Sequence, residues 1–165
     1  KLPVYQDEQF RYLTEKLNGY ITGAYIYNKM GLTEQVATTI TIATPNPVRR
    51  FRFKNLDIEC VKAYCMVYPD ESLVPYLRLL DAIKDMKRIP GTTGQDIYNR
   101  VKSQYFNGYS LPELEKIVSL AKSYPPRVRK VVADILGDIR QTVLQTEMAK
   151  TILPTTRFNL DYKTA

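Results

Sequence analysis

Two changes of hydrophobic period constrain the fold of this chain more than any other feature. Before residue 38 and after residue 70, apolar residues recur every three or four positions, as they do along one face of a helix. Between these regions, TTITIAT (38–44) alternates apolar residues with β-branched polar ones, which is typical of a strand. The sequence therefore predicts an α+β fold in which a small sheet lies between two groups of helices.

Three consecutive segments have the composition of strands. TTITIAT is followed by the turn sequence PNP, then by VRRFRFKN (48–55), and then by LDIECVKAYCMV (56–67). Short connections favour pairing between neighbours in the chain, so we expect an antiparallel meander of about three strands.

The second of these segments separates aromatic from cationic side chains. Side chains alternate between the two faces of a strand, so Phe51 and Phe53 are expected to face the core with Arg49 beside them. The opposite, solvent-exposed face is expected to carry three cations. These are Arg50, Arg52 and Lys54.

Helices are expected on both sides of the sheet. At the N-terminus, residues 7–17 with Asp7 as cap, and a second helix from Thr22 to about Gly31, predict a helical hairpin. Beyond residue 70, five helical stripes are visible, and two of them begin with capping-box sequences. The stripes are ESLVPYLRLLDAIKDMKRI, TTGQDIYNRVKSQYF (Thr93 and Asp96), SLPELEKIVSLAKSY (Ser110 and Glu113), PPRVRKVVADILGDI and DIRQTVLQTEMAKTIL; Gly137 either ends or bends the fourth.

The length and composition fit one globular domain. The chain has 165 residues, of which 44% are hydrophobic, so residues 1–152 are expected to form a single domain and residues 153–165 an extended C-terminal tail. No apolar run approaches the ~20 residues that span a bilayer, and no signal peptide is visible, so we expect no membrane partner. The sequence does not indicate an oligomeric state.

The cysteine and histidine content excludes several kinds of site. With no histidine, the usual zinc sites and serine–histidine triads are excluded. Cys60 and Cys65 are separated by an odd number of positions, so on one strand they would lie on opposite faces and would not pair. We therefore expect a reduced, cytoplasmic protein with no metal and no cofactor.

The positive charge of the chain is concentrated in two places. The formal net charge is +7, and residues 45–68 contain five cations against two anions. A second cluster lies at the start of the helix after residue 125, where the helix dipole disfavours positive charge unless a carboxylate such as Asp134 offsets it. Both clusters are expected to bind an anionic partner, either a nucleic acid or an acidic protein surface. The residues concerned are Arg49, Arg50, Arg52, Lys54, Arg127, Arg129 and Lys130.

Two pairs of carboxylates offer alternatives. Asp57 and Glu59 share a strand face and, with Lys62, would suit a degenerate metal-dependent nuclease. Otherwise they are solvated carboxylates that pair with nearby lysines. Asp81 and Asp85 lie one helical turn apart and either bind a cation or act as acid and base, or pair with neighbouring cations on a surface helix. The candidate cations are Arg78, Lys84 and Arg88.

The succession of these segments resembles a known family. GYITGAYIYNKMGLTEQVATTITIAT (19–44), RRFRF (49–53), LRLLDAIKDMKRIP (77–90) and YPPRVRKVVADIL (124–136) resemble, in order and spacing, the AbiEi-like antitoxins of bacterial type IV toxin–antitoxin (abortive infection) systems. The resemblance covers roughly residues 17–140, and its specificity lies in the succession of the motifs.

The resemblance implies a non-enzymatic role in phage defence. Members of the family join an N-terminal winged helix, which binds DNA and represses the operon, to an antitoxin domain. That domain counteracts a nucleotidyltransferase-like toxin, without necessarily binding it. Residues 1–16 are too few for a winged helix, and residues 140–165 have no counterpart, so the resemblance implies the antitoxin domain alone. The residues leave two alternatives, a basic nucleic-acid-binding module and a degenerate metal-dependent nuclease.

Overall fold

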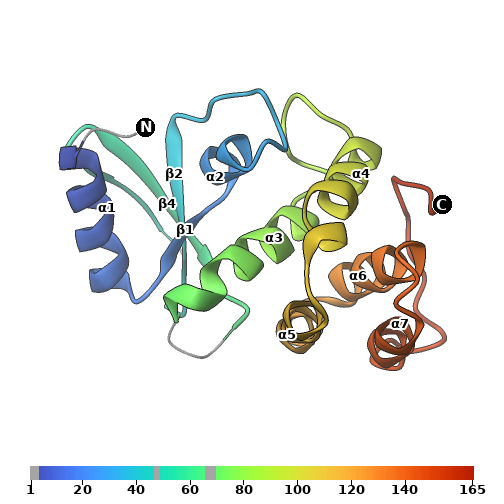
Figure 1. The fold of residues 1–165 in the computed structure, drawn as a ribbon. Helices are drawn as coiled ribbons and strands as arrows, with labels where there is room; N and C mark the ends of the chain where they lie inside the picture. Colours follow the sequence, from blue (N-terminus) through green and yellow to red (C-terminus); the bar gives the residue numbers. More distant parts are fainter. Residues whose placement is uncertain (1–3, 47–48, 66–69) are drawn as a thin grey trace. The chain divides into compact units, whose positions relative to one another are not determined.

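The computed structural model describes residues 4–46, 49–65 and 70–165 (Figure 1). The chain divides into two compact units, Lys1–Arg78 and Leu79–Ala165, so the stretch predicted as one domain contains this division. The first unit contains the sheet, and the second contains helices. The elements in chain order are α1 (Val4–Leu17), β1 (Tyr20–Thr22), α2 (Ala24–Lys29), β2 (Thr39–Thr44), β3 (Arg50–Phe53), β4 (Leu56–Lys62), the 3-10 turn η1 (Glu71–Leu73), α3 (Val74–Lys84), α4 (Gly94–Gln104), the 3-10 turn η2 (Phe106–Gly108), α5 (Leu111–Ala121), α6 (Pro126–Asp138) and α7 (Thr142–Ala149).

The α+β class is confirmed, but the sheet is not the predicted meander. It has four strands in the order β1-β2-β4-β3, and β4 is inserted between β2 and β3. β4 therefore pairs parallel with β2 and antiparallel with β3. Residues 45–49 can span roughly 16 Å when extended. To reach the far side of β4, the chain must cross two strand spacings, which is about 10 Å. A connection of this length can therefore place β3 either beside β2 or beyond β4.

The predicted N-terminal helical hairpin is wrong, because a strand lies between the two helices. Residues Tyr20–Thr22 form β1 and pair with β2, with Thr22 opposite Thr41. Gly23, with φ of 81°, is the N-cap of the short α2, and a Cβ there would lie 2.6 Å from the Cβ of Thr41. This close approach requires glycine. α1 begins at Val4, so Asp7 lies inside the helix and not at its start as expected.

One face of the sheet is apolar across all four strands. The register places Ile21 opposite Ile42, Ile40 opposite Ile58, and Phe51 opposite Ile58 on the other side of β4. The isoleucines are buried, whereas Phe51 and Phe53 are only half-buried, because β3 is an edge strand. The predicted third strand was expected to reach residue 67; β4 ends at Lys62, and residues 66–67 lie outside the described part, as do residues 47–48 of the predicted turn and second strand.

The helices of the second unit follow the local signals of the sequence. Thr93 caps α4 by accepting a hydrogen bond from the Asp96 N–H at 3.1 Å, and Ser110 with Glu113 forms the expected capping box of α5. α6 ends at Asp138, and Arg140, with φ of 64°, reverses the chain before α7. The stripe predicted for α6 is buried. Its members are Val128, Val131, Val132, Ile135 and Leu136.

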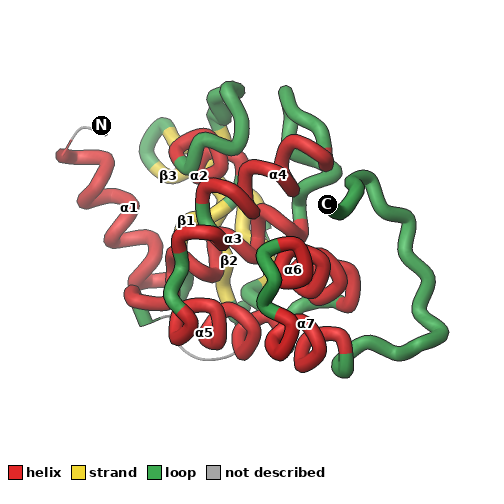
Figure 2. The backbone as a smooth tube through the Cα atoms, turned by 45° about the vertical axis from the view of Figure 1, so that its right-hand side comes forward, coloured by secondary structure: helices red, strands yellow, loops and turns green. Residues whose placement is uncertain are grey.

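After α7 the chain forms neither helix nor strand, as expected (Figure 2). This C-terminal segment, residues 153–165, runs beside α6 and reaches α4 (Figure 1). It is not a free tail, because Tyr162 is buried and stacks on Tyr98 of α4 with ring centroids 4.3 Å apart.

Candidate nucleic-acid interface

β3 is the edge strand of the first unit and carries the densest group of predicted site residues. In the described part of the sheet its only neighbour is β4, and a turn at Lys54 and Asn55 joins the two strands. The two faces of β3 have different chemistry. We call both together the β3 surface, and it consists of Tyr12, Lys16, Arg49, Arg50, Phe51, Arg52, Phe53 and Lys54.

The polar face of β3 is a ladder of ion pairs. Arg50 lies opposite Glu59 and Arg52 opposite Asp57, and each arginine pairs with its opposite carboxylate, Arg52 at 3.5 Å. The arginine side chains are 76% and 69% exposed. Exposed pairs of this kind contribute only about 0–1 kcal/mol, so a phosphate can replace the carboxylate. These two predicted cations are thus solvent-exposed, as expected, but their charge is already partly neutralised.

The other face of β3 packs against α1 through aromatic rings. Tyr12 of α1 stacks on Phe53, with centroids 5.6 Å apart and an interplanar angle of 17°. A pocket of about 200 Å³ lies beside these rings, between α1 and β3; we call it the aromatic pocket. Its lining consists of Tyr12, Leu13, Lys16, Leu17, Arg49, Phe51 and Phe53.

Three cations surround these rings. The Lys16 ammonium lies 5.7 Å from the centre of the Tyr12 ring, the Arg49 guanidinium 5.0 Å from that of Phe51, and the Lys54 ammonium 5.6 Å from that of Phe53. Within the described residues, none of these three cations pairs with a carboxylate.

The expected position of Lys54 on the polar face is therefore wrong. Lys54 has φ of 48° and lies in the turn after β3, where the alternation of side chains no longer holds. The consequence is that aromatic rings and cations share one face, whereas the sequence predicts them on opposite faces apart from Arg49.

Two residues of this surface were not predicted from the sequence. Tyr12 and Lys16 are exposed, one helical turn apart on α1. Their i, i+4 spacing was visible in the sequence, but which strand α1 would cover was not.

The second predicted cluster, at the start of α6, is bound within its own unit. Arg127 pairs with Asp161 at 3.0 Å, and Lys130 pairs with Asp134 at 3.0 Å. Arg129 donates to two backbone carbonyls, those of Tyr124 and Thr151. These partners explain why positive charge is tolerated at this helix start, and the expectation that Asp134 offsets it is confirmed for Lys130.

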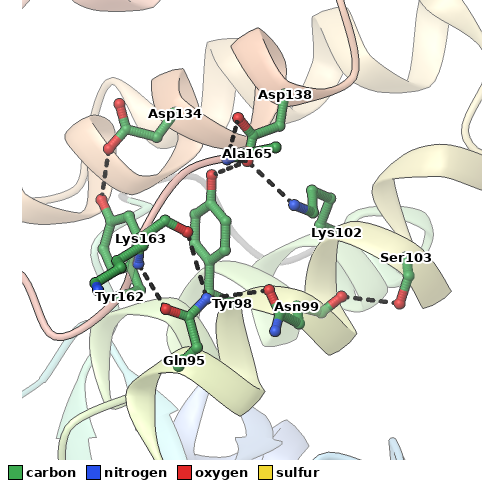
Figure 3. A network of polar contacts seen from close by, with 10 residues as sticks. All are labelled: Gln95, Tyr98, Asn99, Lys102, Ser103, Asp134, Asp138, Tyr162, Lys163 and Ala165. Atoms are coloured by element: carbon green, nitrogen blue, oxygen red, sulfur yellow. Dashed lines mark hydrogen bonds and ion pairs between the residues drawn. The ribbon is translucent and has the colours of Figure 1, made fainter.

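Two aspartates of α6, Asp134 and Asp138, whose side chains are 10% and 7% exposed, hold the C-terminal segment (Figure 3). The Tyr162 hydroxyl donates to Asp134 at 2.7 Å, and the Tyr98 hydroxyl donates to Asp138 at the same distance. Lys102 pairs with Asp138 at 3.1 Å. Burial, and then the hydrogen bond to an aspartate, raise the pKa of both tyrosines well above the ordinary value, so both hydroxyls stay protonated.

Backbone groups of the segment complete this network. The Gln95 side chain accepts from the Lys163 N–H at 2.6 Å and donates to the Lys163 carbonyl at 3.3 Å. The Ala165 N–H donates to both oxygens of Asp138. Burial raises the pKa of the Asp138 carboxyl, but the hydrogen bonds from Tyr98, Ala165 and Lys102 outweigh it and hold the pKa below 3.8.

The carboxylates that the sequence suggested for metal binding or acid–base catalysis form ion pairs and hydrogen bonds with other side chains. Asp57 and Glu59 pair with arginines and not with the lysines that we expected. Asp85 pairs with Lys84 and Arg88, as expected for a surface helix. Asp81 does not lie on the surface: it is 3% exposed and accepts the hydroxyl of Tyr124 at 2.7 Å. No group of three or more residues able to hold a metal ion occurs in the part of the chain that the structure describes.

Cys60 and Cys65 form no disulfide with each other, in agreement with the expectation that they do not pair. Cys60 is buried on the apolar face of β4, where burial raises its pKa although Arg49 acts in the opposite direction. A thiol with a raised pKa is a poor nucleophile, so this cysteine acts as a small apolar residue.

The first unit also has a larger hollow along β1, of about 520 Å³. Arg11, Glu15, Glu71 and Arg78 line it together with backbone and apolar groups, and Arg78 donates to the Ile21 carbonyl at 2.8 Å. Its charges are mixed, which distinguishes it from the cationic aromatic pocket.

No helix among residues 4–46, 49–65 and 70–165 has both the length and the apolar character needed to cross a bilayer.

Comparison with known proteins gives no family assignment. Neither a protein-family model, nor a curated protein, nor a solved structure matches this chain.

Proposed function

We propose that this chain is a non-enzymatic module that binds nucleic acid through the phosphates, using the cations of the β3 surface. One observation carries the proposal: Lys16, Arg49 and Lys54 lie together without carboxylate partners among the described residues, although the neighbouring strand places Asp57 and Glu59 within reach of Arg52 and Arg50. Such cations attract phosphates, and each contact releases a counterion.

The biological role that we propose is that of an antitoxin counteracting a nucleotidyltransferase-like toxin. The support for this role is the likeness of residues 17–140 to AbiEi-like antitoxins. Counteraction of this kind does not require the two proteins to touch, so binding of a nucleic acid is compatible with it.

The binding proposal is tested by measuring affinity for labelled oligonucleotides over a range of salt concentrations. Affinity should fall steeply with salt, and Arg49→Ala should reduce the slope of log K against log salt by about 0.7–0.9. Lys150→Ala, which removes an exposed cation of the second unit, is the matched control and should leave the slope unchanged. If no DNA or RNA binds even at low salt, the proposal is wrong.

The antitoxin role is tested separately by co-expression with a nucleotidyltransferase-like toxin encoded by a neighbouring gene, which the proposal requires. The wild-type chain, preceded by its upstream segment where there is one, should restore growth of cells that express the toxin. If growth is not restored while the protein accumulates in folded form, the antitoxin role is refuted, whatever the affinity for nucleic acid.

A further inference from the structure

Phosphate contacts alone do not account for the rings of the β3 surface. A module that binds only phosphates needs cations, whereas here Tyr12 is 50% exposed beside the half-buried Phe51 and Phe53. Aromatic rings open to solvent next to cations are the arrangement that stacks bases while it holds the backbone.

We infer that the β3 surface binds single-stranded nucleic acid, with one unpaired base stacked at the aromatic pocket and the flanking phosphates held by Lys16, Arg49 and Lys54. This inference rests on the proposed function and adds to it the strandedness of the ligand. In a duplex the faces of the bases are covered by their neighbours, so only an unpaired base can reach the rings.

The size of the pocket fits a single ring. Its volume is about 200 Å³, which is below the roughly 300–1,000 Å³ of sites that enclose a whole ligand. A base inserted there would leave its sugar and phosphates outside, where the cations lie.

The cations now over the rings do not prevent stacking. An exposed cation–π contact is worth roughly 2- to 5-fold in an equilibrium constant. Stacking of one base on an aromatic side chain is worth roughly 5- to 150-fold. Lys16, Arg49 and Lys54 are long side chains at exposed positions, so a base can take the ring face while the cation moves to a phosphate.

Single-stranded nucleic acid accounts for more of the surface than an acidic protein does. Carboxylates of a partner protein would pair with the cations and make no specific use of the faces of Tyr12 and Phe53. We therefore treat an acidic protein as an outcome of the test.

The test compares labelled oligothymidine of about 16 nucleotides with a duplex of equal length. The proteins are the full chain and two matched variants, Tyr12→Phe, which keeps the ring, and Tyr12→Leu, which keeps an apolar side chain without it. We expect Tyr12→Leu to weaken binding of the single strand by roughly 5- to 150-fold with an unchanged salt slope. Tyr12→Phe should change it by less than about twofold, and duplex affinity should not respond to either variant.

Each other outcome has a definite meaning. Equal affinity for single strand and duplex, with no effect of Tyr12→Leu, overturns the inference and leaves the proposed function intact. No binding to either at low salt overturns both. Tight binding of polyglutamate with no binding of the single strand assigns the surface to an acidic protein instead. Thermal unfolding of both variants must match that of the wild type; if Tyr12→Leu unfolds early, Lys16→Ala replaces it, with an expected loss of about 0.7 in the single-strand salt slope.

Discussion

Replacing Glu59 by glutamine removes one ion pair of the β3 surface, the one with Arg50. The replacement should strengthen nucleic-acid binding by a binding module but abolish the activity of a nuclease. Glu59 is the carboxylate that pairs with Arg50 across β3 and β4. Glutamine has nearly the same shape but carries no charge, so the variant releases the Arg50 guanidinium. A binding module should therefore bind nucleic acid more tightly, whereas a nuclease that uses Asp57 and Glu59 should lose cleavage.

The size of the effect follows from the exposure of the pair. Arg50 is 76% exposed, so the freed guanidinium can reach a phosphate without moving the strand. One added phosphate contact steepens the slope of log K against log salt by about 0.7 for a single strand and about 0.9 for a duplex. When the salt concentration is raised fourfold, the affinity of the variant should therefore fall by a factor roughly three times larger than that of the wild type. Exposed pairs contribute about 0–1 kcal/mol, so the free energy of unfolding should hardly change.

The assay is fluorescence anisotropy of a labelled oligonucleotide at several salt concentrations, together with a magnesium-dependent cleavage assay. Glu147→Gln is the matched control, because Glu147 pairs with an exposed cation, Lys122, at 3.7 Å in the second unit. It alters the net charge equally but should leave the slope unchanged. An unchanged or weaker affinity of Glu59→Gln would refute the assignment of Arg50 to the interface, and magnesium-dependent cleavage that this variant loses would establish the enzyme.

Three further predictions concern the second unit. A Cβ on Gly94 would lie 1.9 Å from the Asp161 carboxylate, so Gly94→Ala should lower the free energy of unfolding by about 1–3 kcal/mol; in an Asp161→Ala background, where only the residue 161 carbonyl oxygen at 3.0 Å still crowds the Cβ, urea denaturation should show a smaller effect. The pKa of Asp138 lies below 3.8 in the folded protein, so its stabilisation is complete above about pH 3.8 and is lost as the pH falls through the folded pKa; thermal unfolding of Asp138→Asn should show less acid dependence than the wild type. Ser110→Ala should reduce the free energy of unfolding by about 1 kcal/mol, because the N-terminus of α5 loses its cap, and calorimetry measures this.

The helices of the second unit were predictable because their signals are local. A capping residue and its partner lie three positions apart, as Ser110 and Glu113 do, and an apolar stripe repeats within one helix. β1 was missed for the opposite reason, since Tyr20–Thr22 is too short to show alternation and gains its hydrogen bonds from β2. The order of the strands likewise depends on pairing between distant segments, which no period records.

Some residues of the candidate site were likewise predictable from local patterns, whereas others were not. The alternation of Arg49, Phe51 and Phe53 is local and predicts their shared face, whereas Tyr12 joins them only through the packing of α1. The partner of Arg127 lies 34 residues further on, in a segment without periodicity. A partner at that distance made Arg127 look unpaired in the sequence, whereas Asp134, four residues after Lys130, was predictable.

The C-terminal segment is a structural part of the second unit, because side chains of α6 bind it. A fragment stopped at the last helix, Ala149, would remove the Tyr162 donor of Asp134 and the Ala165 donor of Asp138, and it would uncover one face of the Tyr98 ring. Anyone who trims this protein for crystallisation or fuses a reporter to it should therefore keep the chain through Ala165 and place the junction beyond it.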